Sequence, residues 1–315
     1  MREHLHVIKP STRAFFREGR QLESYSFKNL IHGYIYARWI YLYIGIGVGR
    51  HPLARIYKTL LSTFSRRRKL STGSEPASGS MADGYHGKVL TKSSARALVM
   101  VQEDVTLRDL ESVIPYRSAR DIVLKNPDQI VALICPCRAA RENPCLPLDV
   151  CLIIGEPFAS FVMEHHPERS RKLTPAEAER MLELEHERGH VHHAFFKDAM
   201  LGRFYAICNC CSCCCGAMQA MRNGSPMISS SGYSAHLDQN TCIGCGTCIE
   251  ACNFEALQWL DGLVSMDEAA CMGCGICVDH CTEGAIVLER NLRKSAPLEI
   301  VKLMEAAIQP KAISV

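Results

Sequence analysis

The chain has 315 residues, of which 47% are hydrophobic and 22% are charged. These values exclude disorder throughout the chain and allow about two globular domains. The 18 cysteines are unusual. Secreted disulfide scaffolds are short and carry a signal peptide, whereas this chain begins with a polar, basic stretch. We therefore expect reduced thiols in a cytoplasmic protein, where so many thiolates usually hold metal.

The net charge of +3 conceals a strong asymmetry along the chain. Residues 1–70 contain 14 lysines and arginines against 3 acidic residues. The segment from Asp238 to Glu289 contains nine acidic residues and no lysine or arginine. A basic segment and an acidic segment in one chain predict two different kinds of partner.

The basic N-terminal segment, residues 1–70, includes an apolar, aromatic stretch of 15 residues from Tyr34 to Val48. Arg38 interrupts this stretch, which is shorter than the roughly 20 residues that cross a bilayer. We favour helices packed on the protein's own body or on a partner subunit. Aromatic residues beside basic charge also suit a peripheral contact with the inner face of a membrane. No recognition motif accompanies the charge, so we expect no nucleic-acid binding.

Residues 71–87 are rich in serine, glycine, alanine and proline and are predicted to be a linker. A cysteine-rich α/β domain is expected over residues 88–231. Thr174, followed by Pro175 and Glu177, predicts the start of a helix that ends near Arg188. Short runs rich in β-branched residues predict buried strands at residues 129–135 and 149–155, and residues 203–208 are expected to form another strand.

The sequence repeats itself near the C-terminus. CIGCGTCIEAC begins at Cys242 and CMGCGICVDHC begins at Cys271, so each cysteine has a counterpart 29 residues later. Each run has the spacing C-x2-C-x2-C-x3-C. A [4Fe-4S] cluster needs four thiolates, and the glycines between these cysteines allow one tight loop to supply three. Zinc is the alternative, but four-cysteine zinc sites use two C-x2-C pairs rather than three cysteines plus one.

Over residues 232–290 the repeat resembles a bacterial-type ferredoxin domain with two [4Fe-4S] clusters. The resemblance implies a pseudo-two-fold domain in which the fourth cysteine of each run binds the cluster of the other run. The residue after this fourth cysteine is usually proline in the family, but it is Asn253 in one run and Thr282 in the other. The implied ligands are Cys242, Cys245, Cys248 and Cys281 for cluster 1, and Cys271, Cys274, Cys277 and Cys252 for cluster 2.

Ten further cysteines lie in two tracts of the predicted middle domain. Each tract follows a predicted strand, so we expect the two tracts to converge where the strands end. A further Fe-S cluster ligated from both tracts is the hypothesis that we favour. A redox-active dithiol, a zinc site and buried structural cysteines are the alternatives. The ten candidate metal ligands are Cys135, Cys137, Cys145, Cys151, Cys208, Cys210, Cys211, Cys213, Cys214 and Cys215.

The segment from His186 to His190 fits the H-E-x-x-H pattern of zinc proteases, and His192 and His193 follow it. That pattern requires a helix and a third ligand downstream. Gly189 weakens the helix, and no suitable third ligand follows. We favour a surface or core histidine cluster, with a proton relay or a ligand for the middle site as the alternative.

Together these patterns predict an α+β iron-sulfur protein of an anaerobe that relays single electrons between redox partner proteins. Its C-terminal ferredoxin-type domain would be attached to the cysteine-rich α/β domain and the basic, aromatic helical N-terminal segment, with residues 291–315 as a C-terminal tail. The acidic segment would dock a basic partner. Without a GxGxxG loop, we expect neither nicotinamide nor flavin. The alternatives are an oxidoreductase subunit that reduces a substrate at the middle-domain cysteines, and an Fe-S redox sensor.

Overall fold

The computed structural model describes residues 8–23, 25–54 and 81–308. Most of the predicted linker, residues 71–80, therefore lies outside the described residues. Residues 81–84 form the short helix α5 (Met81–Gly84), and the strand β1 (Tyr85–Val89) follows directly. The chain thus enters the sheet before the linker boundary that we predicted at residue 87.

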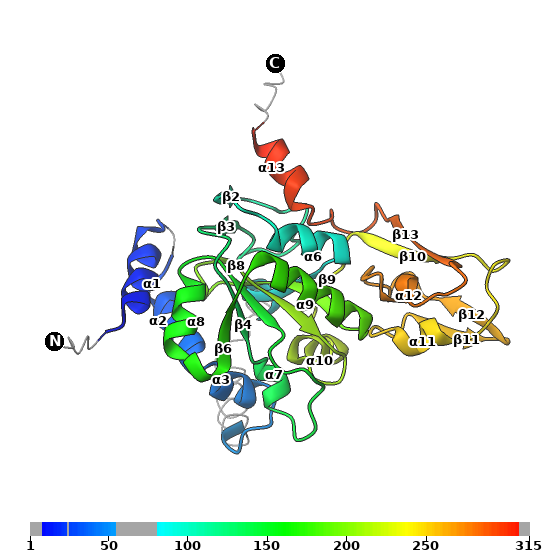
Figure 1. Cartoon of the computed structure of the whole chain (residues 1–315), viewed down its shortest axis with the longest axis horizontal. Helices are drawn as coiled ribbons and strands as arrows, with labels where there is room; N and C mark the ends of the chain where they lie inside the picture. The colour runs from blue at the N-terminus through cyan, green and yellow to red at the C-terminus, as the bar shows by residue number, and fades with distance from the viewer. Residues whose placement is uncertain (1–7, 24, 55–80, 309–315) are drawn as a thin grey trace, which may run out of the picture.

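Within the described residues, seven strands form one sheet in the order β6-β4-β5-β8-β7-β1-β9 (Figure 1). The strands that we predicted around residues 130, 151 and 205 are present as β4, β5 and β8. The bounds are β4 (Ile130–Leu133), β5 (Cys151–Ile154), β6 (Ser170–Leu173), β7 (Val191–Lys197), β8 (Arg203–Cys210) and β9 (Ile228–Ser229).

The middle domain differs from our α/β prediction in the direction of its strands. Among the described strands of this sheet, every neighbouring pair is antiparallel except β1 and β9. The short runs of β-branched residues predict buried strands but not their direction, because strands buried on both faces look alike in either arrangement. Antiparallel neighbours need no crossover helix, so β7 and β8 are joined by a short turn. The domain is therefore α+β.

Each face of this sheet is covered by helices. On one face, Leu133, Cys151 and Phe195 form a core with Phe15, Leu30 and other helical side chains. The covering helices on this face are α1 (Pro10–Gln21), α2 (Phe27–Arg38), α3 (Ile40–Gly47), α8 (Phe158–His165) and α10 (Gly216–Arg222).

The opposite face carries the alternate residues of the same strands, such as Ala132 and Phe196. The covering helices there are α6 (Lys92–Val99), α9 (Pro175–Glu187) and α13 (Ile300–Ile308). The predicted capping box is confirmed at the start of α9, where Thr174 and Glu177 bond to each other's backbone. The helix α13 belongs to the predicted C-terminal tail and packs through the buried Ile300.

The N-terminal helices α1 to α3 lie on the body of the protein, where Phe15, Leu30 and Tyr36 are buried. The Tyr36 hydroxyl lies 2.9 Å from that of Tyr205 on β8. Among the described helices, none combines the length and the apolar character needed to cross a bilayer.

The C-terminal repeat forms two β ribbons and two short helices at the end of the molecule opposite α1 (Figure 1). A shift of 29 residues places the strand β10 (Tyr233–Leu237) on β12 (Leu263–Met266), and β11 (Leu257–Leu260) on β13 (Ile286–Arg290). The ribbons are β10 with β13 and β11 with β12. The remaining elements are β2 (Val105–Leu107), β3 (Ile122–Leu124), α7 (Pro136–Ala139), the 3-10 helix Pro167–Arg169, α11 (Thr247–Ala251) and α12 (Ile276–Asp279).

Candidate metal centres

Each cysteine run of the repeat forms a loop that ends in a short helix. Gly246 and Gly275 precede α11 and α12 with φ angles of 79° and 85°, a conformation that glycine adopts without steric cost. These turns place the third cysteine of each run, Cys248 and Cys277, inside the helix that follows. The two runs therefore have the same backbone path.

The fourth cysteine of each run lies beside the other run. Burial first, and then the neighbouring thiols of Cys242, Cys245 and Cys281, raise the pKa of Cys248. Burial, followed by the thiols of Cys252 and Cys271, raises the pKa of Cys274 to about 12. In each case these neighbours include the fourth cysteine of the other run.

The two groups of four differ in exposure. A small apolar cavity is lined by all four cysteines assigned to cluster 2 and by Phe254, Leu257, Met266 and Leu288. In the group assigned to cluster 1, Cys245 is exposed and Cys242 is half-buried. Cluster 2 would therefore be shielded from water, whereas cluster 1 would lie near the surface.

Backbone amides point at the sulfur atoms of this domain. The Ala256 amide lies 3.3 Å from Cys252 Sγ, and its counterpart at Ala285 lies 3.3 Å from Cys281 Sγ. A third amide, that of Ala235, lies 3.4 Å from Cys271 Sγ. Such N–H groups stabilise negative charge on thiolate sulfur, as an iron-sulfur cluster requires, so these residues fit the group that their spacing predicts.

Asn253, which replaces the usual proline, joins this domain to the middle cysteines. Its Oδ1 accepts a hydrogen bond from the Ser212 amide at 3.0 Å, and its Nδ2 donates to the Gly189 carbonyl at 2.7 Å. Ser212 lies between Cys211 and Cys213. A through-bond link from Cys252 to the second cysteine tract therefore crosses a single hydrogen bond.

Replacing Asn253 with alanine should loosen this junction while both cysteine runs stay intact. The loss of two hydrogen bonds should lower stability by about 1–3 kcal/mol and expose the Ser212 amide to solvent exchange. Thermal unfolding and amide hydrogen exchange of the anaerobic protein measure these effects. The counterpart Thr282→Ala is the control, because the exposed Thr282 side chain bonds to its neighbour Glu283. Equal effects of the two variants would contradict the role of Asn253.

The middle-domain cysteines come together because β5 pairs with β8, which places Cys151 opposite Cys208. The first tract occupies the segment from Cys135 to β5, and the second occupies the end of β8 and the turn before α10. Eight of the ten line one cavity of about 50 Å³: Cys135, Cys137, Cys151, Cys208, Cys210, Cys211, Cys214 and Cys215.

The cavity has features that the sequence did not reveal. Its wall includes the tyrosines Tyr36, Tyr85 and Tyr205. Arg138 also lines it with 1% of its side chain exposed, and donates to the Asn209 carbonyl at 3.0 Å. The same guanidinium lies 3.3 Å from the buried Glu185 carboxylate. A buried ion pair beside so many thiols supplies fixed charge in a region of low dielectric constant.

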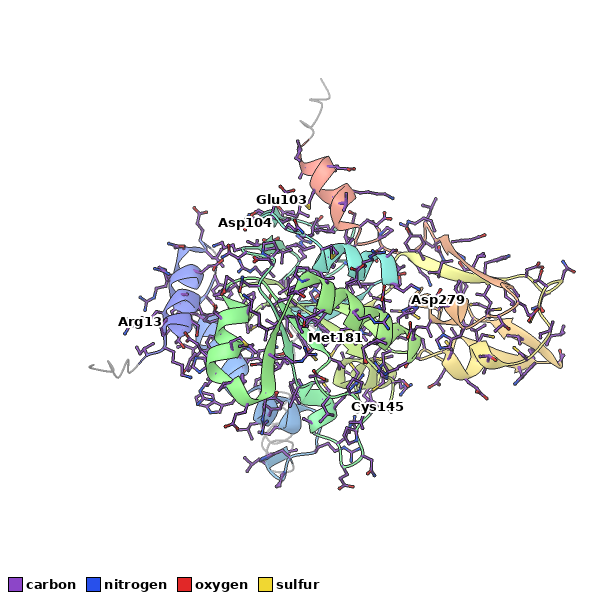
Figure 2. The ribbon with its side chains drawn as sticks, viewed as in Figure 1. Arg13, Glu103, Asp104, Cys145, Met181 and Asp279 are labelled. Atoms are coloured by element: carbon purple, nitrogen blue, oxygen red, sulfur yellow. The ribbon has the colours of Figure 1, made fainter. Side chains whose placement is uncertain are left out.

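Four cysteines form a tighter group at the surface side of this cavity. The Sγ atoms of Cys145, Cys211, Cys213 and Cys214 all lie within 4.8 Å of one another. Cys145 and Cys213 do not line the cavity, and Cys213 is exposed. Figure 2 shows Cys145 in the loop below the body, on the side of α7 and α10. The cavity and this group share Cys211 and Cys214, so the two tracts meet around two overlapping sets of thiols.

The histidines do not form a protease site. The helix α9 ends at Glu187, and Gly189 has a φ angle of +78°, so His186 and His190 do not share a helix face. His186 Nε2 lies 3.0 Å from Asp279 on α12, whereas His190 Nδ1 lies 2.7 Å from Glu185. The core histidine cluster is confirmed.

Two further histidines, His192 and His193 on β7, are fully buried. Burial lowers the pKa of His192 to about 4 and that of His193 to about 3, so both rings are neutral near pH 7. His192 Nδ1 lies 2.6 Å from Asn209 Oδ1, and Asn209 lines the cavity.

Comparison with known protein families supports the iron-sulfur assignment for the C-terminal repeat. Residues 241–286 match the family of 4Fe-4S dicluster domains. A comparison with curated proteins gives no match. The C-terminal region is therefore a ferredoxin-like 4Fe-4S domain, and the chain is an iron-binding, iron-sulfur protein with a second cysteine-rich centre.

Proposed function

We propose that the chain relays single electrons between redox partner proteins through two [4Fe-4S] clusters in its C-terminal domain. The arrangement of the two cysteine runs supports this proposal, because Cys252 lines one cavity with the three cysteines of the second run and Cys281 is a neighbour of Cys248 in the first run. Cys242, Cys245, Cys248 and Cys281 would hold cluster 1, and Cys271, Cys274, Cys277 and Cys252 would hold cluster 2. All eight thiols are then used as ligands, which leaves electron transfer as the chemistry of this domain.

Electrons would enter or leave at cluster 1. Cys245 is exposed, and Ile243 beside it is 67% exposed. All nine acidic residues between Asp238 and Glu289 are exposed. This surface would attract a basic redox protein, and it would bring that protein close to the exposed cluster.

The inner cluster would pass electrons to the middle domain. Cys252 would be a ligand of cluster 2. The next residue, Asn253, accepts a hydrogen bond from the Ser212 amide in the second cysteine tract. The protein would work in the cytoplasm of an anaerobe. The basic N-terminal segment would contact a partner subunit or the inner face of the membrane.

The second candidate function is an oxidoreductase subunit that reduces a substrate at the middle-domain cysteines. The cysteine-lined cavity favours it, because eight thiols, three tyrosines and the buried Arg138 line one space. A simple electron carrier needs no such cavity.

Anaerobic purification followed by metal analysis tests the two-cluster assignment. We expect about eight iron and eight sulfide per chain from the C-terminal domain, and a paramagnetic signal after reduction with dithionite. A colourless protein without acid-labile sulfide would contradict the proposal. The two candidate functions differ in what reoxidises the reduced chain: proteins alone for a carrier, and also a small molecule for an oxidoreductase.

A further inference from the structure

The four thiols of Cys145, Cys211, Cys213 and Cys214 have the spacing of ligands to one metal ion. Cys145 Sγ lies 3.0 Å from Cys213 Sγ, and Cys213 Sγ lies 3.7 Å from Cys214 Sγ. All six separations are within 4.8 Å. A tetrahedral ion with four sulfurs at about 2.3 Å holds those sulfurs about 3.8 Å apart. Cys213 and Cys214 are already at that separation, whereas Cys145 and Cys213 would move apart by about 0.8 Å on binding the ion. An iron-sulfur cube attaches each thiolate to a different iron and so holds its thiolates farther apart.

The backbone around these thiols is fixed by bonds that leave the sulfur atoms free. The turn of the second tract is closed by the Cys214 and Cys215 amides, which both donate to the Cys211 carbonyl at 3.3 and 3.1 Å. Gln219 donates to the Cys213 carbonyl at 2.9 Å. The three ligands of the second tract are therefore held in place by neighbours, as metal sites require.

Positive charge lies close to the group. Arg141, in the same loop as Cys145, donates to the Cys214 carbonyl at 3.1 Å. Arg222 donates to the Ser212 carbonyl at 3.0 Å. Four thiolates and one divalent ion carry a net charge of −2, which these guanidinium groups would offset in part, because Arg222 also pairs with Glu255 at 3.2 Å. The exposed Cys213 gives a metal ion access from solvent.

We propose that Cys145, Cys211, Cys213 and Cys214 form a mononuclear tetrathiolate site for zinc or iron. The site replaces, for these four residues, the further Fe-S cluster that the sequence suggested. It would tie the loop before β5 to the turn after β8 and so form the outer wall of the cysteine-lined cavity. The proposal stands independently of the two-cluster assignment.

Metal and sulfide analysis of the full chain tests this site. We expect one metal ion per chain beyond the clusters, with no matching sulfide. The double variant Cys145→Ser, Cys213→Ser should lose this ion, because it removes two of the four ligands at the least buried positions. Ser212→Ala is the control, because it changes the same turn but keeps the four thiols and the backbone bonds of residue 212.

Cobalt substitution provides a second measurement, and the metal content of the native protein separates zinc from iron. Protein produced with cobalt should show the visible absorption of tetrahedral cobalt thiolate in the wild type and in Ser212→Ala, but not in the double variant. A zinc site gives one zinc per chain, and an iron site gives one iron without sulfide. Both results support the proposal.

Two outcomes would overturn the proposal. Loss of about four iron together with four sulfide in the double variant would show that these thiols hold a cube. A wild-type chain without the extra ion, in which Cys145 and Cys213 form a disulfide, would show a redox-active pair instead. In either case the sulfide and the paramagnetic signal of the C-terminal clusters report separately on the proposed function.

Discussion

Replacing Cys281 with alanine should remove cluster 1, although Cys281 belongs to the second cysteine run. The thiol of Cys281 is a neighbour of Cys248, and Ala285 donates to its sulfur. Without this ligand one iron of the cube has no thiolate, so iron and sulfide should fall by about half. Electron exchange with protein partners should be lost almost entirely, because cluster 1 would lie near the surface.

Double variants identify which cluster has been lost. Adding Cys245→Ala to Cys281→Ala should cost no further iron, because both residues would serve one cluster. Adding Cys274→Ala should remove nearly all the remaining iron. The reverse pattern would show that each run binds its own cluster. Iron and sulfide analysis of the three anaerobic variants, with Cys252→Ala as the equivalent single change at cluster 2, distinguishes the two arrangements.

The C-terminal domain could be predicted from the sequence alone, because the patterns that indicate it lie within short segments of the chain. The spacing within each run and the 29-residue repeat are properties of short segments. The same holds for the buried strands near residues 130, 151 and 205, and for the helix that begins after Thr174. In each case the residues that determine the structure are close together in the chain.

The middle centre could not be predicted in the same way, because its parts are distant in the chain. Cys145 and Cys213 are 68 residues apart and meet only because β5 pairs with β8. Arg138 and Glu185 are 47 residues apart, and nothing in the sequence around either indicates a buried pair. The sequence therefore shows how many cysteines the middle domain contains, but not how they are divided between two centres.

The fold explains why Asn253 departs from the family pattern. The sequence shows that the usual proline is missing from both runs, and Thr282 at the matching position bonds to its neighbour at the surface. The side chain of Asn253 instead contacts two segments of the middle domain. Asn253 therefore serves the junction between the two domains. The family pattern covers only one of these domains and so does not include this contact.

Replacing Gly273 with alanine should destabilise the domain far more than the same change at Gly244, its counterpart in the first run. Both glycines have positive φ angles, 66° and 69°, so a side chain costs about 1 kcal/mol or more at either position. A Cβ atom on Gly273 would lie 2.2 Å from the Tyr233 carbonyl oxygen and 2.4 Å from Ser231 Oγ. A Cβ atom on Gly244 would meet nothing within 4 Å.

The clash at Gly273 falls on the segment that packs against the loop assigned to cluster 2. Ser231 donates to the Gly273 carbonyl at 2.6 Å and accepts from the Tyr233 amide at 3.2 Å. Moving this backbone should add about 1–3 kcal/mol to the shared conformational cost and open the apolar cavity to water. Thermal unfolding and iron content of both variants under anaerobic conditions measure the difference. Equal losses of stability and iron in the two variants would mean that the positive φ angle alone explains why glycine is required. A larger loss in Gly273→Ala would show that packing around the inner cluster requires it.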